Sequence, residues 1–390
     1  MSNSYIISGV RTPIGSFLGS YKSFSATDLG GVVVAGAIDK AGCSNDKIDE
    51  VIMGNVISAG VGQAPARQAA LKAGLPTSIA AVTINKVCGS GLKAAMLADQ
   101  AIRCGDADLI VAGGMENMSM APHITSSMRG GMKLGDASLA DAMVHDGLTC
   151  SFESCHMGMH AEHIAKKFSV SRQDQDEFAA ISQQRAEVAQ KDGVFADEIA
   201  PVTIKHRKGD TVVDQDEGIR PGTTAEGLSG LRTVFDKEGT VTAGNASTLS
   251  DGAAALVIAS EASAASAPWK FKILSSFTSG TDPKDLFIAP VMAVQGALKK
   301  AGLSADDVDL FEINEAFASQ MVACVNELKL DREKVNIYGG GISLGHPIGA
   351  SGARVLVTLV HALRRTGGKR GVASLCLGGG NAVAMVVEAA

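Results

Sequence analysis

The sequence predicts an α/β protein made of two related halves, with one large insertion lodged in the first half. Three features of its 390 residues predict this class: an internal repeat, apolar strands that alternate with amphipathic helices, and a stretch of distinct charge that interrupts the first copy. At roughly 150 residues per domain, the length allows two or three domains with a sizeable core.

The repeat is clearest in two short segments of each half. Residues 37–49 and 297–309 share seven identities in thirteen positions, at an offset of 260. Ser90-Gly91 then matches Ser351-Gly352 at an offset of 261. Related halves are expected to keep such a nearly constant offset, so the helices that begin at these two sites should be equivalent.

Each copy ends in an apolar strand closed by glycines, at residues 107–114 in the first half and 371–380 in the second. In the second copy another apolar strand, residues 381–388, follows at once. Its counterpart in the first copy is residues 251–260, and it comes much later in the chain. An insertion over residues 119–248 explains the delay.

The insertion carries the whole net charge of the chain. Residues 119–248 hold 13 Lys and Arg against 19 Asp and Glu, whereas the rest of the chain holds 22 of each. Ser171, followed by acidic residues, predicts the start of a helix within it. We expect a first half of residues 1–118 and 249–268, an inserted loop domain of residues 119–248, and a second half of residues 269–390, with a mixed sheet in each half.

The composition excludes several classes of protein. The seven cysteines form no C-x-x-C pair, so neither a disulfide framework nor a zinc ribbon fits, and a reducing compartment is expected. The amino terminus lacks the pattern of a signal or import peptide, and no apolar run reaches the roughly 18 residues of a membrane helix. We therefore expect a cytoplasmic protein without membrane partners. Nucleic-acid partners are not expected either, because the formal net charge is −6.

Glycine is the unusual component, at 45 of 390 residues, while aromatic residues fall to 4%. Glycines flank Cys88, which ends an apolar strand and precedes a helix expected over residues 92–103. A helix amino terminus lowers the pKa of a thiol, so Cys88 is a candidate nucleophile. The alternative is that Cys88 is a small core residue, as most cysteines at strand ends are.

Two further segments favour the catalytic interpretation. His346 lies in a glycine-rich turn that the repeat makes equivalent to the region just before Cys88. Packing of the two halves about a pseudo-twofold axis would bring both helix starts together, so that His346 could take the Cys88 proton. Cys376, which ends a strand of the second half before Gly378 to Gly380, adds a second thiol.

These segments resemble the signatures of the thiolase family, over the whole length of the chain. The matching segments are residues 85–91 around Cys88, residues 314–317 (Asn-Glu-Ala-Phe), residues 345–347 (Gly-His-Pro) with 349–352, and residues 376–380 (Cys-Leu-Gly-Gly-Gly). The resemblance implies a five-layered αβαβα arrangement of the two halves plus a loop domain. It also implies that Cys88 becomes acylated by an acyl-CoA, that His346 removes its proton, and that Cys376 abstracts the α-proton of a second acetyl-CoA.

Further roles also follow from the resemblance alone. Asn314 would hold a water that joins His346 in stabilising the enolate, and the backbone N–H groups of Cys88 and Gly378 would stabilise the tetrahedral intermediate. No tightly bound cofactor is implied, coenzyme A thioesters being substrate and product, and a homotetramer (a dimer of dimers) is expected. The positions that match coenzyme A contacts are Leu148, His156, Met157, Arg220, Phe235, Ala243, Ser247, Ala316 and Phe317.

Residues 115–123 and 156–158 are similar to the short-chain, biosynthetic branch, which implies acetyl-CoA C-acetyltransferase activity: reversible condensation of two acetyl-CoA to acetoacetyl-CoA. Residues 286–293 differ from the glycine-rich stretch usual in that branch, so a 3-ketoacyl-CoA thiolase of broader chain length stays open. A non-catalytic acyl-CoA-binding protein is a remote alternative. His156, His160 and His163 share one helical face and could ligate zinc, but they lack a suitably spaced carboxylate and the family uses no metal.

Overall fold

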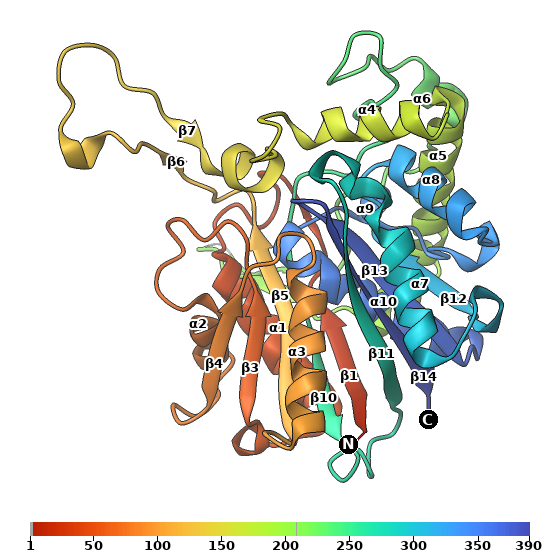
Figure 1. The fold of residues 1–390 in the computed structure, drawn as a ribbon. Coiled ribbons are helices and arrows are strands. Elements are labelled where there is room, and N and C mark those ends of the chain that lie inside the picture. Colours follow the sequence, from red (N-terminus) through yellow and green to blue (C-terminus); the bar gives the residue numbers. More distant parts are fainter. Residues whose placement is uncertain (1–2, 208) are drawn as a thin grey trace.

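The computed structural model describes residues 3–207 and 209–390, and its elements repeat in the two halves (Figure 1). The first half contains β1 (Ser4–Arg11), β2 (Gly15–Ser16), α1 (Ala26–Ala41), β3 (Glu50–Gly54), α2 (Pro65–Lys72), β4 (Ala80–Ile84), α3 (Ser90–Cys104), β5 (Leu109–Asn117) and, much later, β10 (Ser250–Ser260). The second half contains β11 (Phe271–Gly280), α7 (Ala289–Ala301), β12 (Leu310–Ile313), α8 (Ala318–Leu328), α9 (Gly341–Leu344), α10 (Ile348–Thr366), β13 (Arg370–Leu377) and β14 (Asn381–Ala389).

The two halves share one strand order, which confirms the duplication. The first half runs β1-β10-β5-β3 and the second runs β11-β14-β13-β12. In each half the first two pairings are antiparallel and the last is parallel, while β4 adds a further parallel edge strand to β3. Strand β10 pairs with β5 from Asp251↔Asn117 to Ala259↔Leu109, so the late strand fills the place that the repeat predicts for it.

The sheets of the two halves touch at their edges. Strands β1 and β11 pair antiparallel through only Tyr5↔Lys272 and Ile6↔Phe271. This contact links the strands into one ten-stranded sheet, whereas separate mixed sheets were expected.

Helices α3 and α10 fill the space between the two sheets, which confirms the five-layered arrangement. Their side chains share one apolar core with inward residues of both sheets. Helices α1 and α2 cover the outer face of the first sheet, and α7 and α8 cover that of the second. The central helices cross at equivalent glycines: a Cβ on Gly91 would lie 2.5 Å from the Ala353 nitrogen, and one on Gly352 would lie 2.4 Å from the Leu92 nitrogen. No larger residue fits there, so the two helix starts approach as the repeat predicts.

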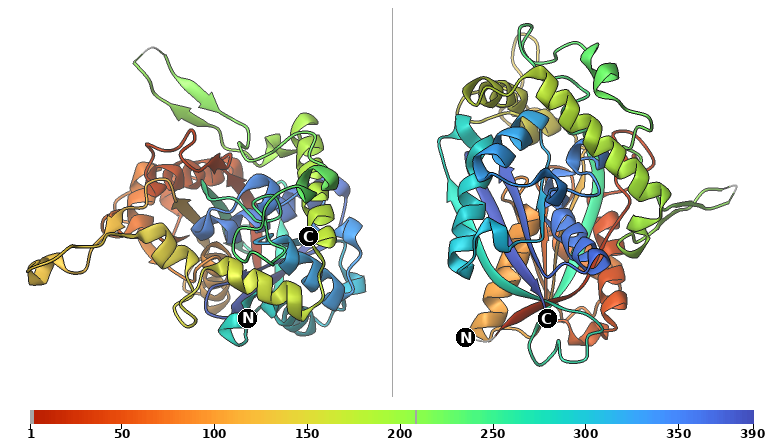
Figure 2. Two further views of the ribbon diagram at one scale, coloured as in Figure 1. Left: turned by 90° about the horizontal axis from the view of Figure 1, so that it is seen from above. Right: turned by 90° about the vertical axis from the view of Figure 1, so that its right-hand side faces the viewer.

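The segment between β5 and β10 lies over one end of both sheets (Figures 1 and 2). It contains β6 (His123–Ile124), β7 (Ala140–Asp141), α4 (Met157–Lys167), α5 (Arg172–Lys191), β8 (Val202–Ile204), β9 (Thr211–Val213) and α6 (Ala225–Ser229). The hairpins β6–β7 and β8–β9 project from the body. Ser171 caps α5 through a capping box with Asp174, which confirms the predicted helix start.

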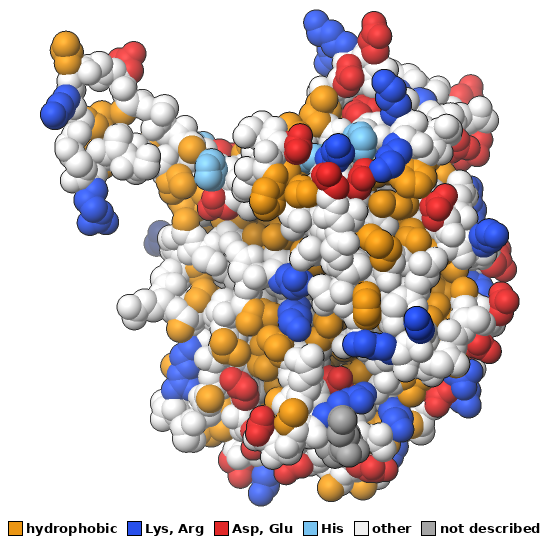
Figure 3. Space-filling model, in the orientation of Figure 1, with side chains coloured by type: hydrophobic (Ala, Val, Ile, Leu, Met, Phe, Trp, Pro, Cys, Tyr) orange, Lys and Arg blue, Asp and Glu red, His pale blue; other side chains and the backbone are white. Residues whose placement is uncertain are grey.

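Basic and acidic side chains are interspersed over the face shown in Figure 3. Across residues 3–207 and 209–390, no helix is both long and apolar enough to cross a bilayer.

Candidate active site

A cavity of about 670 Å³ opens where the inserted segment covers the ends of the strands, and the predicted site residues gather around it. Its wall includes Cys88, His346, Cys376 and Gly378, contributed by both halves. Asn314 lies directly behind this wall, fully buried against His346. The predicted coenzyme A contacts also line the cavity: Leu148, His156, Met157, Arg220, Phe235, Ala243, Ser247, Ala316 and Phe317. Ser16 and Phe17 line it too, and no motif in the sequence had indicated them.

A tight turn between β4 and α3 presents Cys88 to the cavity. Val87 adopts φ +48°, a left-handed conformation that is rare for a β-branched residue. The Ser90 hydroxyl holds this turn, accepting from the Lys86 N–H at 2.8 Å and donating to the Val87 carbonyl at 2.7 Å. The backbone N–H groups of Cys88 and Gly378 both hydrogen-bond to the Cys88 thiol and favour its ionised form. Two amide donors from different halves therefore converge on the sulfur.

The prediction that the helix amino terminus lowers the pKa of Cys88 is wrong in direction. Burial, with a smaller contribution from the nearby Glu116 carboxylate, raises the pKa of this thiol to about 12. The two N–H donors act in the opposite sense but offset only part of the desolvation. In the resting protein Cys88 is therefore a neutral thiol that needs a base when it reacts.

Glu116, at the end of β5, is a buried carboxylate that the sequence did not single out. It accepts hydrogen bonds from the N–H groups of Val56 at 3.1 Å, Ile57 at 3.2 Å and Gly349 at 2.9 Å. Burial raises its pKa to about 7 despite these donors. Glu116 thus holds the start of α10 against the loop after β3, close to Cys88.

His346 lines the same cavity as Cys88, and its hydrogen bonds fix its tautomer. Nδ1 lies 2.6 Å from the Ser351 hydroxyl, which itself donates to the Pro347 carbonyl at 2.9 Å. The Ser351 oxygen must then accept from Nδ1–H, so Nε2 carries the free lone pair. Burial, helped by the charge of Arg354, lowers the pKa of His346 to about 3.

Asn314 lies beside this imidazole, and Arg354 orients it. The Asn314 amide nitrogen is 3.4 Å from His346 Nε2, while its carbonyl oxygen accepts from Arg354 Nη2 at 3.2 Å. Arg354 also pairs with Glu312 at 3.6 Å. A single charged residue in the apolar middle of α10 is a signal that would have revealed Arg354 from the sequence.

Cys376 ends β13 and is 1% exposed. Burial raises the pKa of its thiol well above the ordinary value, and the neighbouring Cys88 thiol adds to the increase. Cys376 and Cys88 also line the same cavity, so the two thiols from different halves face one space.

The shifted pKa of His346 predicts a pH dependence of stability. Its folded-state pKa of about 3 lies below the unfolded value of roughly 6.5, so only the unfolded chain takes up this proton as the pH falls from 7 to 5. The native state should lose about 2 kcal/mol of unfolding free energy from this group by pH 5. Urea unfolding at both pH values should show a smaller loss for His346→Gln than for the wild type. Equal losses would contradict the assigned pKa.

Apolar and aromatic side chains form the outer part of the cavity. His156 stacks on Phe235 with ring centroids 4.7 Å apart, and Phe317 contacts Phe235 edge-on at 6.2 Å. His156 also caps α4 by accepting the Gly158 N–H at 3.0 Å. Stacked and edge-on rings thus form one aromatic wall of the cavity.

The three histidines of α4 and its cap do not form a zinc site. His160 approaches the Cys155 sulfur at 3.6 Å, and His163 pairs with Asp285 at 2.8 Å, whereas His156 faces the cavity. Within the described part of the chain, no three His, Cys, Asp or Glu side chains gather so that they could hold a metal ion.

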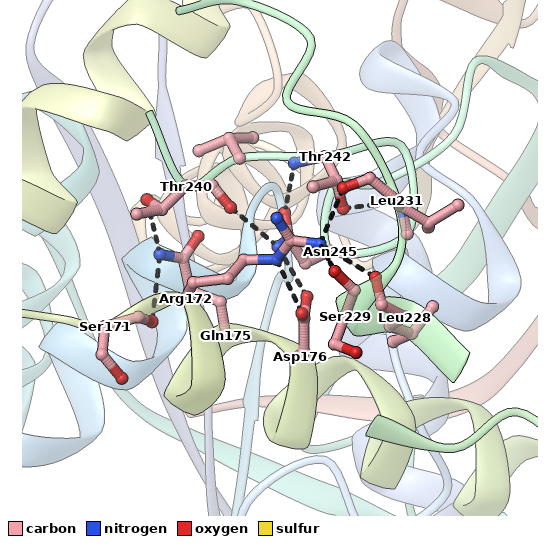
Figure 4. Close-up of polar contacts among 12 residues, drawn as sticks. Ser171, Arg172, Gln175, Asp176, Leu228, Ser229, Leu231, Thr240, Thr242 and Asn245 are labelled. Carbon is pink, nitrogen blue, oxygen red and sulfur yellow. Dashed lines mark hydrogen bonds and ion pairs between the residues drawn. The ribbon is translucent and has the colours of Figure 1, made fainter. Parts of the chain in front are cut away.

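A buried polar network holds the cavity loop of residues 240–247 against α5 (Figure 4). Asp176 binds Arg172 Nε at 2.6 Å and accepts from Asn245 Nδ2 at 2.9 Å. Asn245 in turn accepts the Thr242 N–H at 2.8 Å, and the Ser247 N–H donates to the Ala316 carbonyl at 3.0 Å. Ala243 and Ser247 are thus placed by contacts with both α5 and the second half.

Family models cover nearly the whole chain. One described as the thiolase N-terminal domain matches residues 4–262, and one described as the thiolase C-terminal domain matches residues 267–389. The chain belongs to the thiolase family.

Individual thiolases support this assignment over their full length. The chain is 51% identical to an acetyl-CoA acetyltransferase of Cupriavidus necator, with 100% of both chains covered. It is also 51% identical to an acetyl-CoA acetyltransferase of Escherichia coli, covering 100% of this chain and 99% of that one. The crystal structure of the Bacillus anthracis acetyl-CoA acetyltransferase superposes with a TM-score of 0.97 at 42% identity, covering 100% and 99% of the chains.

Proposed function

We propose that this acyltransferase of the thiolase family is an acetyl-CoA C-acetyltransferase, which condenses two acetyl-CoA to acetoacetyl-CoA and coenzyme A and runs the reverse thiolysis. The convergence of Cys88, Cys376 and the His346–Asn314 pair in one cavity is the observation that carries the proposal. The relatives at about half identity that bear the name acetyl-CoA acetyltransferase support the choice of substrate.

The first half-reaction transfers an acetyl group to Cys88. As the sulfur attacks the thioester carbonyl, His346 Nε2 takes the thiol proton, which couples ionisation to attack and avoids a free buried thiolate. The oxyanion that forms is stabilised by the N–H groups of Cys88 and Gly378. The coenzyme A thiolate then leaves and takes a proton from Cys376, since Cys376 must lose its own proton before it can act as a base.

The second half-reaction forms the carbon–carbon bond. The Cys376 thiolate abstracts a proton from the methyl group of a second acetyl-CoA. The enolate oxygen is stabilised by His346, now able to donate from Nε2, and by a water held by Asn314. The enolate carbon attacks the acetyl group on Cys88, and the Cys88 sulfur leaves and takes its proton back from His346 Nε2. Each step uses a thiol, an imidazole, a carboxamide or a backbone N–H, so the proposal needs no tightly bound cofactor.

In this proposal the inserted segment binds coenzyme A. The aromatic wall at His156 and Phe235 would hold the pantetheine arm, with Arg220 towards the nucleotide. In this proposal residues 119–248 are the loop domain. The first half is residues 1–118 with 249–268, and the second half is residues 269–390. A homotetramer and a cytoplasmic location complete the proposal.

Chain-length preference separates the proposal from a 3-ketoacyl-CoA thiolase of broader range. Met118, Met143 and Ile348 line the cavity and pack in one apolar cluster against Cys88, which leaves little room for a long acyl chain. We expect kcat/KM for thiolysis to fall at least about tenfold between 3-ketoacyl-CoA substrates of four and six carbons, because the extra methylenes must displace packed side chains. A flat or rising series would favour the broader enzyme, and no turnover with any substrate would favour a binding protein.

A further inference from the structure

Two cysteines outside the catalytic group face each other in a short hairpin at the rim of the cavity. Thr149 and His156 form an antiparallel bridge, and the Cys150 N–H donates to the Cys155 carbonyl at 2.8 Å on the turn side of it. The Ser154 N–H closes the loop by donating to the Cys150 carbonyl at 2.8 Å. The return bond thus comes from Ser154 and not from Cys155, so Ser154 and Cys155 together lie across from Cys150 as in a β-bulge.

The 2.8 Å bond from the Cys150 N–H to the Cys155 carbonyl holds the two Cα atoms near the roughly 5.5 Å of a hydrogen-bonded pair in antiparallel strands. A disulfide needs a Cα separation of roughly 4.4 to 6.8 Å. The backbone pairing of Cys150 and Cys155 thus lies within the range that a disulfide spans without rearrangement of the chain. Burial raises the pKa of the Cys155 thiol, and the Cys150 thiol adds to the increase.

The surroundings give the two thiols different roles. Cys155 is partly exposed, whereas Cys150 is 3% exposed. The Cys155 sulfur lies 3.6 Å from His160 Nε2, within reach for transfer of the thiol proton to that nitrogen. An oxidant reaches Cys155 first, and Cys150 is placed to resolve the product.

We propose that Cys150 and Cys155 are a dithiol that hydroperoxides convert to an intramolecular disulfide. Cys155 gives its thiol proton to His160 and its sulfur attacks the peroxide, an S–O bond forms and the O–O bond breaks. The outer oxygen leaves with that proton, as water from hydrogen peroxide or as an alcohol from an organic hydroperoxide. The Cys150 thiol then attacks the sulfenic sulfur, an S–S bond forms, the S–O bond breaks, and water leaves. Each sulfur loses one electron and the peroxide is reduced by two.

The hairpin connects this modification to the substrate cavity. Leu148 and His156, just outside its two ends, line the cavity, and Phe152 at its turn lies over Gly379. Fixing the hairpin should therefore change the KM for coenzyme A thioesters. This consequence rests on the proposed function, whereas formation of the disulfide does not.

Peptide mapping of the full chain tests the disulfide directly. Residues 134–166 contain Cys150 and Cys155, no other cysteine, and no internal Lys or Arg, so trypsin releases both thiols on one peptide. After treatment with hydrogen peroxide and alkylation, we expect this peptide to be unalkylated and lighter by two hydrogens, and dithiothreitol should restore alkylation at both sites. Cys88 and Cys376 lie on other peptides, so their oxidation is scored separately.

Two variants define the outcome. In Cys150→Ser, Cys155 should stop at a sulfenic acid that dimedone traps, and Cys155→Ser should leave Cys150 reduced under the same treatment. The proposal is overturned if the wild-type peptide stays alkylated at both sites while Cys88 is oxidised, or if Cys155 instead bridges to another peptide. Loss of activity without the disulfide would point to the catalytic thiols, and a disulfide without any change in KM would overturn only the link to the substrate cavity.

Discussion

Replacing Cys88 with alanine is expected to lower kcat/KM for acetoacetyl-CoA thiolysis by at least about 10⁴-fold, because the acyl-enzyme can no longer form. No other thiol can substitute for it. Cys376 is buried at the end of β13, and only Cys88 has the two amide donors of Cys88 and Gly378 aimed at its sulfur. A spectrophotometric assay of the cleavage of acetoacetyl-CoA measures the loss.

Cys376→Ser is the matched control, since it removes the base and keeps the nucleophile. This variant should lose steady-state condensation but still accumulate one acetyl group per chain on Cys88 when it is mixed with acetyl-CoA. Intact mass spectrometry detects the added group and peptide mapping locates it. Full turnover by Cys88→Ala, or acetylation of Cys376 in place of Cys88, would contradict the proposed roles of Cys88 as nucleophile and Cys376 as base.

Replacing Arg11 with methionine is expected to cost about 3 to 5 kcal/mol of unfolding free energy. Arg11 is fully buried in β1, with Nε 2.5 Å from Glu198 and its two terminal nitrogens 2.7 and 2.9 Å from Asp216. Burial alone would lower the pKa of Arg11, but the charges of Asp216 and Glu198 more than compensate, so the guanidinium stays charged. Without it two buried carboxylates lose their partner. Because both belong to the inserted segment, that segment should loosen first.

The exposed pair Lys72–Asp28 provides the comparison. Lys72 Nζ lies 2.6 Å from Asp28 Oδ1, a distance similar to those in the Arg11 pairs, but the two side chains are 39% and 40% exposed. Lys72→Met should therefore cost no more than about 1 kcal/mol. Denaturant unfolding of both variants measures the difference, and similar costs for Arg11→Met and Lys72→Met would show that the buried pairs do not anchor the insertion. Hydrogen exchange should show the loss of protection of residues near Asp216 in Arg11→Met.

Local sequence patterns predicted most of the fold and of the candidate site. The repeat at residues 37–49 and 297–309 predicted two halves of one topology, and the late strand at 251–260 predicted where the insertion ends. Glycine turns next to Cys88, His346 and Cys376 predicted the site, because a strand end, a tight turn and a helix start are encoded by neighbouring residues. The same reasoning found the capped start of α5 at Ser171.

The ionisation states of buried side chains and the contacts between distant residues could not be predicted from local sequence patterns. The expectation for Cys88 considered the helix start beside it, but desolvation by all surrounding groups is larger and reverses the shift. Arg354 acts on Asn314 from 40 positions away, and Arg11 pairs with Asp216 across 205 positions. No local pattern reports such contacts.

By itself the sequence determined the two related halves and predicted the insertion and the residues proposed to do the chemistry, because each is encoded by segments of a few neighbouring residues. Only the tertiary structure decided that the sheets join through β1 and β11, that the resting thiol and imidazole are neutral, and that Arg354 orients Asn314. The physical reason is that solvent exclusion and long-range pairing depend on every group packed around an atom, and those groups come from the whole chain.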